Sequence, residues 1–150
     1  MSTVQANQDR TAVDLSLLII RLAVGIIMAA HGAQKLFGMF DGPGLAATVE
    51  KMGQIGYLVG IGECLGGIGL VVGFLTRFSA AANIVIMIGA IAMVHGKNGF
   101  FMSAGGFEYN LALIGLLAPI LISGPGKWAI GRMLPLPKSR LTGKPVIVLE

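Results

Sequence analysis

The chain has 150 residues, of which 55% are hydrophobic and only 12% are charged, and it contains 23 glycines. A soluble domain carries roughly 25% charged residues and needs polar side chains over its large surface. The composition therefore argues against a disordered chain and a soluble monomer. A single cysteine, Cys64, excludes an intramolecular disulfide and a cysteine-only zinc site.

Apolar stretches long enough to cross a membrane define the predicted fold. A spanning helix needs about 20 mostly apolar residues. The fourth stretch reaches this length only if Glu108 lies at the interface, and it contains Pro119, which a membrane helix tolerates when neighbouring groups compensate. The predicted fold class is therefore all-α, a polytopic membrane protein built on a four-helix transmembrane bundle. The four predicted spans are residues 15–36, 57–75, 78–95 and 107–123.

The first loop contains a helix-start signal. Pro43 follows Asp41 and Gly42, and proline favours the first helical position. We therefore expect a short amphipathic helix at residues 45–52, in the first outer loop, lying on the membrane surface. The predicted organisation is an N-terminal cytoplasmic segment (1–14), a transmembrane domain (15–123) and a basic cytoplasmic tail (124–150).

The distribution of Lys and Arg predicts the orientation. Positive charge marks the cytoplasmic side, and the side that holds both termini is the richer one. Its basic residues are Arg10, Arg77, Lys127, Arg132, Lys138, Arg140 and Lys144. The opposite side holds only Lys35, Lys51 and Lys97. Both termini are therefore predicted to be cytoplasmic. Because the basic residues concentrate in the tail, they are expected to face lipid headgroups, and no nucleic-acid partner is expected.

Glycines in the second span form two stripes. At about 100° per residue, Gly62, Gly66, Gly69 and Gly73 share one narrow arc. Gly56, Gly60 and Gly67 form a second stripe on the side of Glu63. Small residues at this spacing let membrane helices approach closely, so the second span is predicted to contact neighbours on two faces.

Two charges lie inside predicted spans, where charge is costly. Arg21 has two interpretations: it extends to the cytoplasmic interface, or it pairs with a buried acid. Glu63 is expected to find its partner in His31, Arg21 or the start of the fourth span. It is either a tether between helices or a carboxylate that handles a proton or binds a ligand.

Several polar residues from different helices map to one half of the bundle, the predicted outer half. They are His31, Lys35, Glu63, His95, Glu108 and Asn110. Two His and two carboxylates can bind a transition metal, but no His-x-x-x-His or Glu-x-x-His spacing occurs, so no metal site is predicted. A polar pocket for a small molecule or a quinone headgroup is favoured over a metal site, and for any single residue a purely structural collar at the membrane surface is favoured further. No catalytic residue is identified.

Four motifs in this order resemble the DoxX family of small bacterial membrane proteins. They are Arg21 followed by His31-Gly32-x-x-Lys35-Leu36-Phe37, Gly62-Glu63-x-x-Gly66-Gly67, Thr76-Arg77-Phe78 and Phe107-Glu108-Tyr109-Asn110-Leu111. The resemblance implies a four-helix membrane bundle in the bacterial inner membrane. It also implies recurrent polar positions at Arg21, His31, Lys35, Glu63 and Glu108.

Family members are commonly labelled oxidoreductases, and some relatives belong to a thiosulfate:quinone oxidoreductase. Many relatives follow the last span with a Ser-Leu-Asp-like ending, which residues 124–130 lack. Any cytoplasmic-side site formed by that ending is therefore in doubt here.

Three functions remain open from the sequence. The first is a membrane subunit of an oxidoreductase system that binds a quinone or docks a redox partner. The second is a small proton-coupled carrier with Glu63 and Arg21 along its path, which four helices accommodate only as a homo-oligomer. The third is a scaffold or assembly factor without chemistry of its own.

Overall fold

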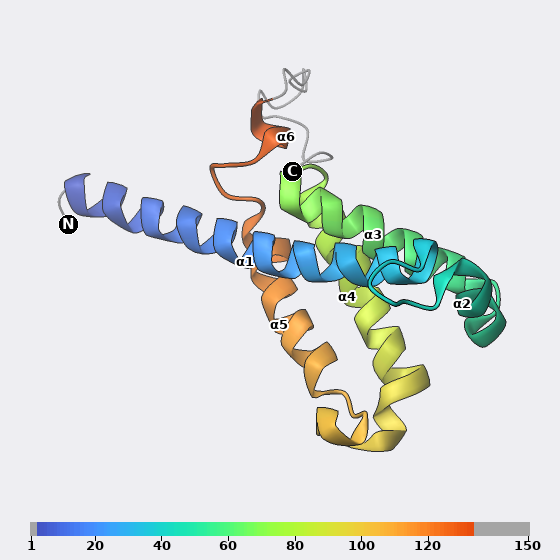
Figure 1. Cartoon of the computed structure of the whole chain (residues 1–150). Coiled ribbons are helices and arrows are strands. Elements are labelled where there is room, and N and C mark those ends of the chain that lie inside the picture. The colour runs from blue at the N-terminus through green and yellow to red at the C-terminus, as the bar shows by residue number, and fades with distance from the viewer. Residues whose placement is uncertain (1–2, 134–150) are drawn as a thin grey trace, which may run out of the picture.

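The computed structural model describes residues 3–133. The regular secondary structure of this part of the chain is all helical, without strands. Short loops and turns join the helices (Figure 1). The α-helices are α1 (Thr3–Phe37), α2 (Gly44–Met52), α3 (Ile55–Val72), α4 (Thr76–Ala90), α5 (Glu108–Ser123) and α6 (Ile130–Met133). Between α4 and α5 lie a π-helix, η1 (Ile91–His95), and two 3₁₀ turns, η2 (Gly96–Asn98) and η3 (Met102–Ala104).

Three helical stretches are long and apolar enough to cross a membrane: Asn7–Phe37, Ile55–Val72 and Thr76–Asn98. They correspond to the first three predicted spans. The fourth predicted span coincides with α5, an apolar helix of only 16 residues. The helix of the first span begins at Thr3, because no glycine or proline interrupts the chain before residue 15. Much of the predicted N-terminal segment is therefore the start of α1. Residues 134–150 of the predicted tail lie outside the described part.

The closest helix pairing joins α1 to α3, and it depends on glycine. A Cβ on Gly67 would clash with the backbone of Ala29, and a Cβ on Gly32 would clash with the backbone of Cys64. In each case the obstacle is main chain, which cannot rotate away. The stripe that contains Gly67 therefore lets α1 and α3 approach to backbone contact, as small residues do in membrane helices.

The other glycine arc of α3 faces α4. A Cβ on Gly62 would lie 2.7 Å from Ile86 Cδ1, one on Gly69 would lie 2.6 Å from Ser79 Oγ, and one on Gly66 would clash with the Asn83 amide. Gly73 was predicted to share this arc. Instead it ends α3 with a left-handed φ of 75° and packs against Ala129 and Arg21.

The two ends of the helical core differ, and we name them by what they carry. The hairpin end carries the turn between α3 and α4 and the segment 124–133. The loop end carries α2 and the connection from α4 to α5. Figure 1 shows α4 and α5 side by side, running away from the α1–α3 pair to their connection, while α2 lies at the right-hand tip of that pair.

The short helix α2 begins one residue earlier than the predicted 45–52 and follows Pro43 directly. It packs against α1 and α3: the buried Thr48 hydroxyl donates a 3.2 Å hydrogen bond to the Lys35 carbonyl, and Gly56 lies against Thr48. The helix therefore covers the loop end of the α1–α3 pair, a contact that the prediction of a surface-lying helix did not include.

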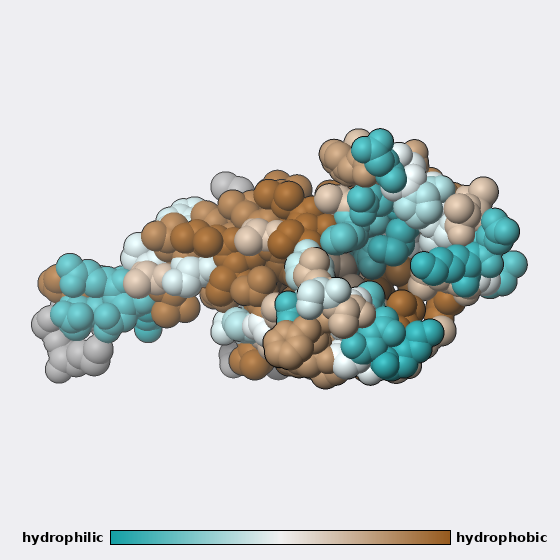
Figure 2. Space-filling view, turned by 60° about the horizontal axis from the view of Figure 1, so that its bottom comes forward, coloured by the Kyte–Doolittle hydropathy of each residue, from teal (hydrophilic) through white to brown (hydrophobic). Residues whose placement is uncertain are grey.

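The core lies where the four long helices meet, and it comprises Val24, Met28, Leu70, Ala80, Met87, Leu113, Leu117 and Ile120. Large hydrophobic side chains also cover the outside: Leu58, Phe78, Val85 and Ile122 are each about 70% exposed. Figure 2 shows this hydrophobic surface across the middle of the molecule, with hydrophilic groups gathered towards its two ends. Such a surface fits a lipid environment, in which apolar side chains face the acyl chains.

Candidate ligand-binding cavity

A cavity of about 720 Å³ opens at the loop end, and every helix from α1 to α5 contributes to its wall. Most of the lining side chains are apolar. The polar side chains that line it include those of His31, Lys35, Glu63, His95 and Asn110. The cavity therefore brings together five of the seven polar residues predicted to handle a ligand or a proton.

Two of these polar residues, Lys35 and Glu63, form an ion pair. Lys35 Nζ is 2.6 Å from Glu63 Oε2; the Glu63 side chain is buried, whereas the Lys35 side chain is 24% exposed. Lys35 lies in the last turn of α1, and the glycine at position 60 leaves room beside it, since a Cβ there would be 3.6 Å from Lys35 Cβ. A charge-assisted bond of this length stabilises the carboxylate inside a largely apolar site.

The predicted partners of Glu63 were therefore wrong. Neither His31 nor Arg21 is bonded to Glu63; its partner is Lys35, one helical turn beyond His31. The signal was present in the sequence, because Lys35 shares one face of the first helix with Gly25, Met28 and Gly32. That face meets the glycine stripe beside Glu63 once α1 and α3 touch.

Aromatic and amide groups complete the polar wall. His31 meets Tyr109 edge to face, with ring centroids 6.1 Å apart, and this contact joins α1 to the start of α5. The buried Asn110 amide donates to Met87 Sδ at 3.5 Å. Tyr109 lines the cavity, although it was not among the predicted site residues. Its place next to Asn110 at the polar start of α5 was the available signal.

His95 lies at the rim, at the end of the π-helix η1. Its Nδ1 is 2.8 Å from the Gly105 carbonyl oxygen. A carbonyl can only accept, so Nδ1 carries the proton and Nε2 of the neutral ring is left as an acceptor. The wide π turn, a feature often found at functional sites, places this imidazole over the cavity and ties α4 to the loop before α5.

Methionines form much of the apolar wall: Met28, Met52, Met87, Met93 and Met102 line the cavity. Unbranched thioether side chains adapt to irregular apolar shapes. A methionine-lined wall therefore suits a flexible apolar ligand group.

Arg21 lies outside the cavity, at the hairpin end. Its Nη1 donates to the Pro125 carbonyl at 2.6 Å and its Nη2 to the Trp128 carbonyl at 2.5 Å. Arg21 is buried and bonds to no acid, so the predicted pairing with a buried acid was wrong. Its side chain extends instead to the segment after α5, at the hairpin end. Its planar fork binds two main-chain carbonyls, which fastens the segment after α5 onto α1.

Glu108 also lies outside the cavity lining. It is the first residue of α5, where a carboxylate is favoured by the positive end of the helix dipole. Its backbone N–H donates to the Phe100 carbonyl at 2.9 Å. Within residues 3–133, no three His, Cys, Asp or Glu side chains are grouped so that they could hold a metal ion.

The comparisons with known proteins agree with this architecture. The sequence profile of the DoxX family matches residues 16–96. A Mycobacterium tuberculosis protein named "Uncharacterized membrane protein Rv3486" is 29% identical over 79% of this chain and 81% of its own length. No solved structure gives a significant match.

Two further relatives have informative names. The Bacillus subtilis protein named "Putative oxidoreductase CatD" is 31% identical over 67% of this chain and 74% of its own length. The Escherichia coli "Inner membrane protein YqjF" is 28% identical over 81% of this chain and 93% of its own length. The profile match covers more than half of the chain, so the chain belongs to the DoxX family of membrane proteins.

Proposed function

We propose that this protein is a membrane subunit of an oxidoreductase system, and that its cavity binds the headgroup of a lipid-soluble quinone. The observation that carries the proposal is the cavity itself: an apolar, methionine-rich space with one polar wall built around the Lys35–Glu63 ion pair. Its volume of about 720 Å³ suits a small organic ligand, because such sites usually measure about 300–1,000 Å³ and hold few polar groups.

The chemistry of a quinone matches the polar wall. Its two carbonyl oxygens accept hydrogen bonds, and Lys35, His31 and Tyr109 carry the groups that can donate them. Its isoprenoid tail is apolar and flexible, as the methionine wall requires. The name of the relative CatD supports a redox role.

Reduction of a quinone to a quinol takes up two electrons and two protons. The proposal therefore includes a redox partner protein as the electron donor. Lys35 places a proton-bearing ammonium beside the headgroup, and the Glu63 carboxylate next to it can accept a proton.

The proposal also fixes a membrane arrangement. We place α5 across the membrane as the fourth span, although its 16 residues reach only about 24 Å of a hydrocarbon core about 30 Å thick. The excess of Lys and Arg puts both termini in the cytoplasm and the loop end outside. The name of the relative YqjF supports a location in the bacterial inner membrane.

The alternative functions fare differently. The carrier hypothesis placed Arg21 and Glu63 along one path, but Arg21 is engaged by carbonyls at the hairpin end and Glu63 by Lys35 at the loop end. Arg21 and Glu63 therefore do not line a common path, and the carrier hypothesis loses its structural basis. A scaffold without bound ligand is an outcome of the experiment that follows.

That experiment is purification in mild detergent followed by mass spectrometry of both bound lipids and bound proteins. We expect a quinone to accompany the wild-type protein and to be lost from a folded Glu63→Gln variant. The matched control is Gly115→Leu, because Gly115 lies on α5 outside the cavity and a Cβ there meets nothing within 4 Å. Stable capture of a partner protein without any quinone would contradict the proposal and favour the scaffold.

A further inference from the structure

Helices α3 and α4 are closely packed near the hairpin end and separate towards the loop end. Gly69 and Ser79, then Gly66 and Asn83, and finally Gly62 and Ile86 form successive contacts between them. The next turn of α4 breaks this pattern, because a Cβ on Gly89 would meet nothing within 4 Å. Gly89 nevertheless lines the cavity. The cavity therefore begins where the contacts between α3 and α4 end.

The other sides of the cavity are closed by specific contacts. The Lys35–Glu63 ion pair bridges α1 and α3, and the edge contact of His31 with Tyr109 bridges α1 and α5. On the side between α3 and the α4–η1 stretch, the lining side chains are themselves on the surface: Leu58 is 71% exposed, Val85 68% and Met93 64%. These three residues form an apolar rim.

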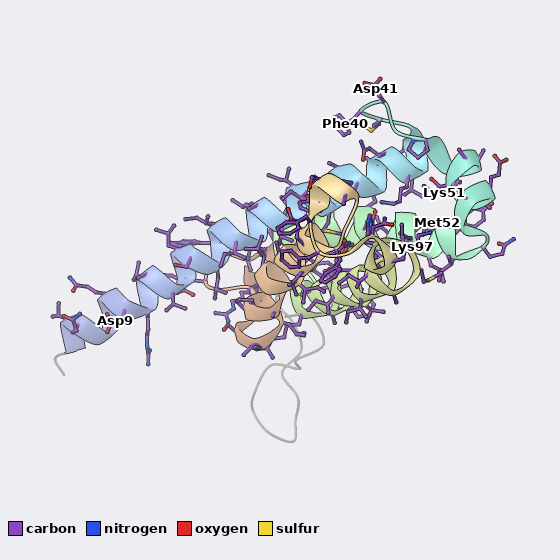
Figure 3. The ribbon with its side chains drawn as sticks, turned by 90° about the horizontal axis from the view of Figure 1, so that it is seen from below. Asp9, Phe40, Asp41, Lys51, Met52 and Lys97 are labelled. Atoms are coloured by element: carbon purple, nitrogen blue, oxygen red, sulfur yellow. The ribbon has the colours of Figure 1, made fainter. Side chains whose placement is uncertain are left out.

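The position of this rim relative to the lysines of the loop end indicates whether it faces water or lipid. Lys51 of α2 and Lys97 of η2 lie at the loop end, far from Asp9 at the start of α1 (Figure 3). Cations in these positions suit the level of the lipid headgroups, whereas the apolar rim suits the acyl chains below them. A solute in water meets the charged side of the loop end, and a solute in the bilayer meets Leu58, Val85 and Met93.

From these observations we infer that the gap between α3 and the α4–η1 stretch is a lateral portal, through which an amphipathic ligand enters from the bilayer with its polar head first. The head reaches the Lys35–Glu63 pair, and the apolar tail trails through the gap among lipid chains. This inference deepens the proposed function and rests on it for the identity of the ligand. The portal itself can be tested without a quinone.

The test uses a fluorescent indole on the polar wall. Trp128 is the chain's one tryptophan, so the double variant Trp128→Phe/Tyr109→Trp carries a single indole, on the polar wall of the cavity. The protein is reconstituted in phosphatidylcholine vesicles that contain a fatty acid with a nitroxide on its acyl chain. We expect the nitroxide to quench the indole, because acyl chains reach the cavity through the portal.

Adding Gly89→Phe should remove most of this quenching, because the new side chain starts in free space at the gap and carries a ring large enough to block it. Adding Gly115→Phe should change nothing, since that glycine also has free space around it but lies outside the cavity. Circular dichroism confirms that each variant is folded.

Quenching that persists unchanged in Gly89→Phe, or an indole that only the water-soluble quencher acrylamide reaches, would overturn the portal. Decylubiquinone added to the wild-type protein, which keeps Tyr109, separates the two proposals. If it fails to bind while Gly89→Phe still blocks the nitroxide, the portal stands and the quinone assignment falls.

Discussion

At the scale of single residues, the Lys35–Glu63 pair is asymmetric. Glu63 is buried, whereas the Lys35 side chain keeps about a quarter of its surface exposed. A buried ion is costly without its partner, while a partly exposed lysine can turn towards water. The lysine is therefore the partner that can move when a ligand arrives, and the carboxylate is the fixed point of the site.

Glu63→Gln is expected to lower thermal stability in detergent by about 1–3 kcal/mol, because it replaces a charged hydrogen bond and leaves the Lys35 ammonium partly buried. The double variant Glu63→Gln/Lys35→Met should recover part of this loss, since it removes both charges. A double variant that is less stable than the sum of the two single changes would contradict the direct pairing.

Arg21 is expected to be sensitive even to a conservative change. Arg21→Lys should lower thermal stability by about 1–3 kcal/mol, because the two carbonyls are held by two separate nitrogens of a rigid planar fork, and lysine offers a single nitrogen on a flexible stem. The segment after α5 should loosen and become susceptible to trypsin at the exposed Lys127. The cavity lies at the other end and should still bind its ligand.

The control is Arg77→Lys, because Arg77 makes a longer 3.2 Å bond to the Ile122 carbonyl. It should change cleavage less than Arg21→Lys does. Equal cleavage in the two variants would contradict the role of Arg21 in fastening the segment after α5 onto α1.

The bonding partners of Arg21 and Glu63 could not be predicted from the sequence. The partners of Arg21 are main-chain carbonyls, which have no side-chain signature in a sequence. The pairing of Lys35 with Glu63 depends on how far α1 slides along α3, which the contact of Gly32 with Cys64 sets. By contrast, the gathering of polar residues in one half of the bundle could be predicted, because helix lengths alone fix depth along a span.

At the scale of elements, α3 is the centre of the bundle, with α1 on one face and α4 on the other. The two glycine stripes were predictable from helical periodicity. Their unequal tolerance of an added side chain was not. Gly67 meets main chain, whereas Gly66 meets the side chain of Asn83. An obstacle made of main chain cannot adjust, whereas a side chain has other rotamers.

Gly67→Ala is therefore expected to destabilise the bundle by about 1–3 kcal/mol, because it forces α1 away from α3. Gly66→Ala should cost less. Gly66→Leu, with its longer side chain, should also disrupt packing, while Gly115→Leu should be mild. Melting in detergent, followed by circular dichroism, measures this order. A Gly67→Ala protein as stable as Gly115→Leu would refute backbone contact between α1 and α3.

At the scale of the whole molecule, the all-helical membrane fold could be predicted because long apolar stretches leave a chain few alternatives in lipid. The arrangement of the helices could not, since α4 separates from α3 only beyond the contact of Gly62 with Ile86. The cavity is a product of that divergence. Its existence depends on tertiary packing and not on any local motif.

The orientation is tested by labelling introduced cysteines on a Cys64→Ala background. We expect an impermeant maleimide to label Lys97→Cys in cells with an intact inner membrane, and to label Lys127→Cys only after permeabilisation, because an excess of positive charge marks the cytoplasmic side of membrane proteins. The reverse pattern would place the loop end, with the cavity, on the cytoplasmic side.

The central claim is that the cavity binds a quinone headgroup at the ion pair. Its most direct test is equilibrium binding of radiolabelled decylubiquinone to the protein in lipid nanodiscs. We expect saturable binding of one molecule per chain, lost in a folded Glu63→Gln variant, weakened by His31→Ala and unchanged in Gly115→Leu. No saturable binding to the wild type, or undiminished binding to folded Glu63→Gln, would contradict it.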